Sequence, residues 1–145
     1  MTYVGAPHIY YGDEIAMEGG RDPDCRRPFL WGWQQAPRRV EMHHYYRKLA
    51  TLRNANPALR TGTFRTLHAA GMVYGFERSD ANATFVIALN ASKAAAQMPL
   101  DLTARGGAVT ATVAMTGATE TWKPGASVSL PAETGRVFRI AKAGR

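Results

Sequence analysis

Few side chains in this sequence are of types that carry out chemistry by themselves. Asp13 and Glu14 are the one adjacent acidic pair, and two carboxyl groups can serve as an acid and a base. Consecutive side chains on extended backbone point to opposite faces, so these carboxyl groups are poorly placed to converge on one substrate. The sequence therefore predicts no catalytic residue here.

Cys25, His43 and His44 are of types that react or bind metals. Cys25 is the single cysteine, and no histidine or asparagine that would activate it can be recognised nearby, so we interpret it as a small buried apolar residue. His43 and His44 have no partner four residues further on and no neighbouring cluster of cysteines or carboxylates. We interpret them as surface or packing residues and expect neither a metal nor a cofactor.

The overall composition excludes several classes of protein. The 145 residues suffice for one domain, or for a small domain and part of another, and the net charge of +7 raises the question of nucleic-acid binding. Residues 1–60 carry nine basic and six acidic side chains and residues 61–145 carry nine and five, so neither half is a basic block and no nucleic-acid partner is expected.

Apolar runs and cysteine content bear on location. Gly, Pro, Arg or Asp interrupts every apolar run well before it could span a bilayer of about 30 Å, so we expect no membrane partner. A lone cysteine forms no internal disulfide, which favours a reducing compartment and a cytoplasmic location.

The first 60 residues contain three kinds of segment. Residues 1–11 are rich in β-forming side chains and predict a short buried strand. Residues 12–37 form a Gly-, Asp-, Arg- and Trp-rich loop, long enough that it should bind or cover something. Residues 37–53 repeat apolar side chains every three or four positions, which predicts an amphipathic helix that ends before Pro57. One strand and one helix cannot bury a two-sided apolar strand, so this part needs partners.

After Arg60 the pattern changes to short β-rich runs separated by turn residues. Their number and spacing predict an antiparallel sandwich or barrel, and the run at residues 85–89 is apolar on both faces, as a central strand requires. The predicted strands are residues 63–67, 72–78, 84–90, 97–102, 108–115, 119–122, 127–130 and 136–141.

Three stretches together resemble one protein family. They are GAPHIYYGDEIAMEGGRDPDCRRPFLW, EMHHYYRKLATLRNANPALRTGTF and MVYGFERSDANATFVIALNAS, which follow one another in order over essentially the whole chain. They are similar to the C-terminal part of α-amylase-type glycoside hydrolases, in particular the neopullulanase, cyclomaltodextrinase and maltogenic amylase enzymes.

The resemblance implies a mainly β fold in two parts. Residues 1–57 would be the last strand, loop and helix of a (β/α)8 barrel, and residues 58–145 the antiparallel β-sandwich called domain C. Retaining hydrolysis needs two carboxyl groups about 5 Å apart. In the family these groups precede the matched region, so the chain is expected to be a C-terminal fragment of an α-glucan-active hydrolase, a truncated or split frame that is inactive alone.

The resemblance also implies a binding site. Asp22 and Arg26 match a family loop whose Asp and Arg, four residues apart, help line sugar subsites. A carboxylate can accept and a guanidinium can donate hydrogen bonds to sugar hydroxyls; alternatively, the two residues pair with each other. Trp31 and Trp33 would stack on sugar rings or cover the barrel end. The implied partners are α-glucan oligosaccharides and a separate upstream barrel chain, or a second copy through the exposed strand. The competing function is a noncatalytic carbohydrate-binding or interaction sandwich.

Overall fold

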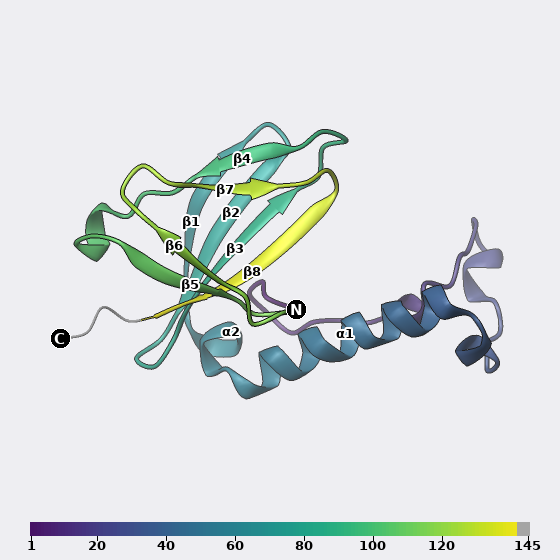
Figure 1. Cartoon of the computed structure of the whole chain (residues 1–145). Coiled ribbons are helices and arrows are strands. Elements are labelled where there is room, and N and C mark those ends of the chain that lie inside the picture. The colour runs from purple at the N-terminus through teal and green to yellow at the C-terminus, as the bar shows by residue number, and fades with distance from the viewer. Residues whose placement is uncertain (142–145) are drawn as a thin grey trace.

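The computed structural model describes residues 1–141 and joins a β-sandwich to a long projecting helix (Figure 1). The strands are β1 (Thr63–Ala70), β2 (Val73–Ser79), β3 (Thr84–Asn90), β4 (Ala96–Pro99), β5 (Val109–Val113), β6 (Thr119–Trp122), β7 (Ser127–Leu130) and β8 (Thr134–Ile140). The α-helices are α1 (Pro37–Ala55) and α2 (Pro57–Thr61), and single 3-10 turns lie at Asp13–Ile15, Asp24–Arg26, Trp33–Gln35 and Thr103–Arg105.

The strands form two antiparallel sheets. The larger sheet has the order β1-β2-β3-β8-β5-β6, and the smaller one pairs β4 with β7. β4 packs against β2 and β7 against β3, so the small sheet lies across one face of the large one (Figure 1). Each strand predicted after Arg60 is present with small differences at its ends, and the predicted antiparallel sandwich is confirmed.

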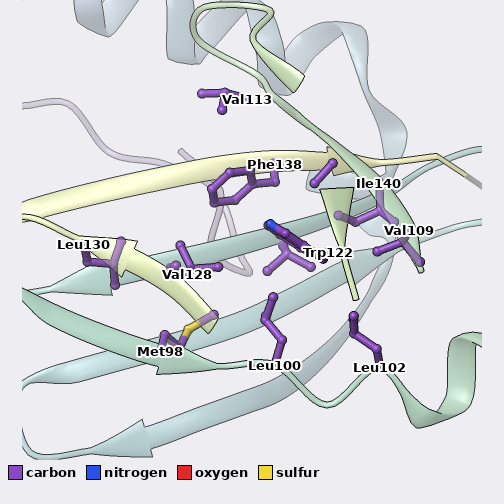
Figure 2. Close-up of a cluster of buried hydrophobic side chains, with 13 residues drawn as sticks. Met98, Leu100, Leu102, Val109, Val113, Trp122, Val128, Leu130, Phe138 and Ile140 are labelled. Atoms are coloured by element: carbon purple, nitrogen blue, oxygen red, sulfur yellow. The ribbon is translucent and has the colours of Figure 1, made fainter. Parts of the chain in front are cut away.

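Two apolar clusters lie on opposite faces of the large sheet. The first fills the space between the sheets, where Trp122 meets Phe138 edge to face at 4.8 Å between ring centroids (Figure 2). The second lies under α2 and includes Ala58, Leu59 and Phe76. β3 alternates between them and is buried on both faces, which confirms the prediction of a central strand.

Helix α1 begins and ends close to where its sequence predicts. Pro37 occupies the first turn, where its missing N–H is harmless, and the helix ends at Ala55 because Asn56, which precedes Pro57, is extended with φ −126°. Among the nineteen residues of α1, only Arg53 is buried. The apolar stripe that the periodicity predicted is therefore half-buried and not enclosed in a core. None of the helices within residues 1–141 combines the length and hydropathy needed to cross a lipid bilayer.

The strand predicted at residues 1–11 is wrong for this structure. The segment is irregular, with bends at Tyr3–Gly5, and its large apolar side chains are 41% to 52% exposed. A strand exists only where a neighbour pairs with its N–H and C=O groups, and no described residue pairs with this segment as a strand. Self-association through this segment stays a prediction.

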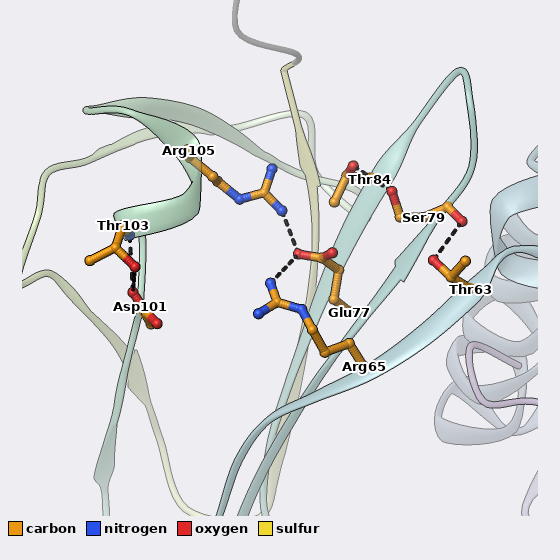
Figure 3. Close-up of polar contacts among 8 residues, drawn as sticks. All are labelled: Thr63, Arg65, Glu77, Ser79, Thr84, Asp101, Thr103 and Arg105. Atoms are coloured by element: carbon orange, nitrogen blue, oxygen red, sulfur yellow. Dashed lines mark hydrogen bonds and ion pairs between the residues drawn. The ribbon is translucent and has the colours of Figure 1, made fainter.

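Polar contacts fasten the open edge of the large sheet. Glu77 on β2 accepts hydrogen bonds from Arg65 on β1, at 3.3 Å, and from Arg105, which follows β4 (Figure 3). Ser79 and Thr84 share a hydrogen bond of 2.9 Å at the turn between β2 and β3. The edge strand β1 is thereby tied to the loop between β4 and β5.

The sandwich should lose stability selectively when its inner cluster is emptied. Phe138→Ala removes a fully buried ring and should lower the free energy of unfolding by about 3–5 kcal/mol, whereas Leu89→Ala, at a 38% exposed position, should cost about 1 kcal/mol or less. Denaturant midpoints measured by far-UV circular dichroism would check both values. Equal losses for the two variants would contradict the assignment of the core.

Candidate functional site

The loop of residues 12–36 lies at the N-terminal end of α1, far from the sandwich (Figure 1). Its first turn is closed by its own acids: Asp13 accepts a hydrogen bond from the Tyr10 N–H at 3.2 Å, and Glu14 accepts one from the Gly12 N–H at 2.9 Å. Ile15 is completely buried, and its turn packs against α1. Asp13 and Glu14 thus stabilise the turn, and their carboxyl groups do not form a convergent pair.

A second carboxylate holds the middle of the loop together. Arg27 donates to both oxygens of Asp24, at 2.5 and 2.7 Å, and also to the Glu18 carbonyl at 3.1 Å. The Gly20 N–H donates to Asp24 at 2.8 Å. The hydrogen bonds from Arg27, aided by the one from Gly20, hold the pKa of Asp24 below its usual value. Sequence reasoning missed this clamp, although opposite charges three residues apart on one turn are its signal.

The predicted binding residues Asp22 and Arg26 are brought together. Their side chains form an ion pair at 2.7 Å, and 69% of Asp22 and 62% of Arg26 remain exposed. This is the alternative in which the two residues pair with each other. Exposed ion pairs are weak because water competes for both partners. The pair can therefore exchange its contact for a polar ligand, and its sugar-binding role stays a prediction.

Cys25 is exposed, and the prediction that it is buried is wrong. It lies on the surface turn Asp24–Arg26, and its thiol reaches Asp22 Oδ1 at 3.8 Å. The prediction followed the usual burial of free cysteines. It failed because the clamp between Asp24 and Arg27 fixes this turn at the surface, where no apolar layer of the described chain covers the sulfur.

The two tryptophans of the loop have different surroundings. Trp33 lies against His43 of α1 with 4.6 Å between ring centroids, so it packs on the helix and gives His43 a packing contact. Trp31 is 81% exposed and meets only the edge of Phe29 among the aromatic side chains described, at 5.0 Å. Trp31 thus presents a large apolar face on the same loop as the ion pair of Asp22 and Arg26. Among residues 1–141, no cluster of side chains could hold a metal ion.

Of two hollows in the surface, only one is lined by residues of this loop. One of 190 Å³ is formed by the loop itself and is lined in part by Tyr10, Asp13 and Arg27. A larger one of 660 Å³ lies between α1 and the chain after β5, at Ala114 and Met115. Size therefore does not locate the site, because the larger hollow does not include the loop.

Comparisons with known proteins show which enzymes this chain resembles. No family model matches the sequence. The chain is 41% identical over 91 residues to a cyclomaltodextrinase of Thermoanaerobacter pseudethanolicus, covering 63% of this chain and 16% of that enzyme. It is 43% identical over 81 residues to neopullulanase 2 of Thermoactinomyces vulgaris, covering 54% of this chain and 14% of that enzyme. The chain thus spans about a sixth of the length of these relatives.

Solved structures share the same arrangement over nearly the whole chain. The structure matches that of an α-amylase of Anoxybacillus with a TM-score of 0.78 and 31% identity. The match covers 94% of this chain and 29% of the α-amylase chain. It also matches a debranching enzyme from Nostoc punctiforme with a TM-score of 0.68 and 34% identity. That match covers 94% of this chain and 28% of the debranching enzyme's chain. Coverage of this extent includes most of the loop and α1 as well as the sandwich.

The fold and the sequence together fit the C-terminal part of the α-amylase-family glycoside hydrolases to which the chain is similar. Within that family, the curated relatives are cyclomaltodextrinases, a neopullulanase, amylopullulanases and a maltogenic amylase. The predicted family resemblance is confirmed.

The clamp predicts a titration that can be followed at one amide. Because the pKa of Asp24 is lowered, the clamp persists above the ordinary carboxyl value of 3.8 and weakens as the pH falls through the lowered pKa. The Gly20 amide resonance should therefore shift with an apparent pKa below 3.8, measured by two-dimensional NMR, and Asp24→Asn should abolish the shift.

The Thr103 amide supplies the control for this titration. It donates to Asp101, whose pKa is also lowered by hydrogen bonds from Thr103, so its resonance should titrate equally in both proteins. A Gly20 shift that survives Asp24→Asn would disprove the clamp.

Proposed function

We propose that this chain is the C-terminal part of an enzyme that hydrolyses α-glucosidic bonds in maltooligosaccharides, cyclodextrins or pullulan. Residues 1–57 would complete a (β/α)8 barrel, and residues 58–145 would form domain C. The observation that carries the proposal is the position of the loop, directly before the N-terminus of α1. In such barrels the loops that lead from a strand into its helix form the catalytic face.

The chemistry requires groups from the rest of the barrel. Two carboxyl groups about 5 Å apart must flank the scissile bond in a retaining enzyme. Here Asp13, Glu14 and Asp24 are engaged in holding the loop. Residues 1–145 alone should therefore be inactive.

The exposed apolar side chains support a missing neighbour. Val4, Ile9, Tyr10 and Tyr11 are 41% to 48% exposed along one irregular segment. Burying apolar surface of this kind stabilises by about 25 cal/mol per Å². The remaining barrel strands would cover the segment and pair with its main chain, which would restore the strand that is absent here.

Asp22, Arg26 and Trp31 would form the part of the sugar site that this chain supplies. A sugar hydroxyl can take the place of each ion-pair partner, donating to the carboxylate and accepting from the guanidinium. The 81% exposed indole of Trp31 offers a face on which a sugar ring can stack. The acarbose bound to the similar α-amylase of Geobacillus thermoleovorans, with a TM-score of 0.78 and 26% identity, supports an oligosaccharide as the ligand. The lone cysteine favours a cytoplasmic location.

A hybrid enzyme tests the proposal. Residues 1–145 would replace the matching C-terminal part of the Thermoanaerobacter pseudethanolicus cyclomaltodextrinase, and cyclodextrin cleavage would be assayed. The hybrid should be active and the isolated chain inactive. Asp22→Asn and Arg26→Gln should each lower kcat/KM about 10-fold or more, because hydrogen bonds to charged groups contribute about 1.5–3 kcal/mol.

Arg21→Gln, at an exposed position in the same loop, provides the matched control and should leave kcat/KM nearly unchanged. Turnover by the isolated chain would overturn the proposed division of the enzyme. Unchanged kinetics in both the Asp22 and the Arg26 variants would remove the sugar site from this loop.

A further inference from the structure

Two buried arginines meet where α1, α2 and the sandwich join. Arg53, near the end of α1, is 7% exposed, and Arg78, on β2, is 1% exposed. Among the described residues, all seven hydrogen bonds that their guanidinium groups donate end on main-chain carbonyl oxygens. Main-chain carbonyl groups therefore take the place of water around both charges. Any guanidinium N–H that lost its carbonyl partner would be buried without a hydrogen bond, which would destabilise the fold.

The start of the chain curls around Arg53. Its guanidinium donates to the carbonyl oxygens of Met1 at 2.7 Å, Tyr3 at 3.1 Å and Gly5 at 2.5 Å, and to that of Leu59 in α2 at 2.7 Å. Gly5 has φ +87°, a conformation that side chains other than glycine rarely adopt. The curl thus depends on a residue that tolerates this backbone geometry.

Arg78 holds the same segment from the side of the sheet. It donates to the Thr2 carbonyl at 3.1 Å and to the carbonyls of Gly62 and Thr63 at 3.2 Å each. The Tyr3 ring meets two phenylalanines of β1 and β2 edge to face, with centroids 5.2 and 5.5 Å away. Residues 1–5 therefore lie between helix and sheet, with one arginine on either side.

Beyond this joint, α1 stands away from the sandwich. A hollow of 660 Å³ lies between the second half of the helix and Ala114 and Met115, and another of 600 Å³ lies between the first half of the helix and Met115 and Thr116. The nineteen residues of α1 span about 28 Å and carry the loop at their far end (Figure 1). A rotation of about 10° at the joint would move the loop by about 5 Å over a helix of this length.

We propose that Arg53 and Arg78, acting through the main chain of residues 1–5, set the angle of α1 against the sandwich and thereby position the loop of residues 12–36. The two are positioning residues, since neither lies in the loop. Burial, with the nearby charge of Arg53, lowers the pKa of Arg78, as expected for a water-excluded joint. The proposal concerns the chain without sugar and so goes beyond the proposed function.

Lysine substitution separates the geometry of the joint from its charge. A lysine keeps the positive charge but concentrates its donors at one point, so it cannot reach carbonyls on several sides of a planar group. The double variant Arg53→Lys/Arg78→Lys should loosen the joint. The matched control is Arg47→Lys/Arg139→Lys, which makes the same changes at exposed positions of α1 and β8.

The loop already contains its own labelling site, the exposed Cys25. A second cysteine, Ser129→Cys, on an exposed position of β7 would allow two spin labels, and electron paramagnetic resonance would measure the distance distribution between loop and sandwich. The distribution should widen at least about twofold in the double lysine variant, because even small rotations of α1 at the joint displace the loop at its far end by several Å. It should stay unchanged in the control.

A second variant acts on the segment and leaves both arginines intact. Tyr3→Ala removes the aromatic anchor of a residue that is 52% exposed, so the sandwich should remain folded, and it should widen the same distribution. Unchanged distributions in both test variants would overturn the proposal. So would a widening accompanied by collapse of the resolved indole N–H resonance of buried Trp122 in two-dimensional NMR, since the arginines would then maintain the sandwich itself.

Discussion

A buried guanidinium group must find acceptors for its donors in several directions within one plane, and this requirement organises the junction of the molecule. Arg53 and Arg78 meet it with carbonyl oxygens from three separate parts of the chain: the first five residues, α2 and the start of β1. Apolar packing of α2 and of the Tyr3 ring on the sheet holds the same parts together, and the two arginines add contacts of fixed direction. The junction thus combines directional polar contacts with apolar packing, whereas the space between the two sheets is filled by apolar packing alone.

The two halves of the chain consequently differ in self-sufficiency. The sandwich encloses its own cluster of thirteen buried residues and closes each strand against a neighbour. The N-terminal part leaves Tyr10, Tyr11 and Trp31 exposed and depends on local clamps such as the one between Asp24 and Arg27. A division of this kind is expected if the proposed barrel precedes the β-sandwich, because the loop would then be shaped by local contacts and by the barrel.

The sequence predicted the sandwich well because period-two alternation and turn residues act locally, and the doubly apolar run at residues 85–89 marked the central strand. It failed at residues 1–11, since strand formation needs a partner that the described chain does not supply. The family resemblance singled out Asp22 and Arg26, which do lie together, but sequence reasoning missed the ion pair between Asp24 and Arg27. The roles of Arg53 and Arg78 were also hidden, because carbonyl acceptors leave no trace in residue identity.

We propose that the carbohydrate contacts of this chain lie in the loop before α1 and outside the sandwich. Titration of the isotope-labelled chain with maltotriose, followed by two-dimensional NMR, tests it most directly. The account predicts that the resonances that move belong to residues 20–33, and that Asp22→Asn weakens their response. Resonances that move on the sandwich instead, with the loop silent, would contradict the account and identify a noncatalytic sugar-binding domain.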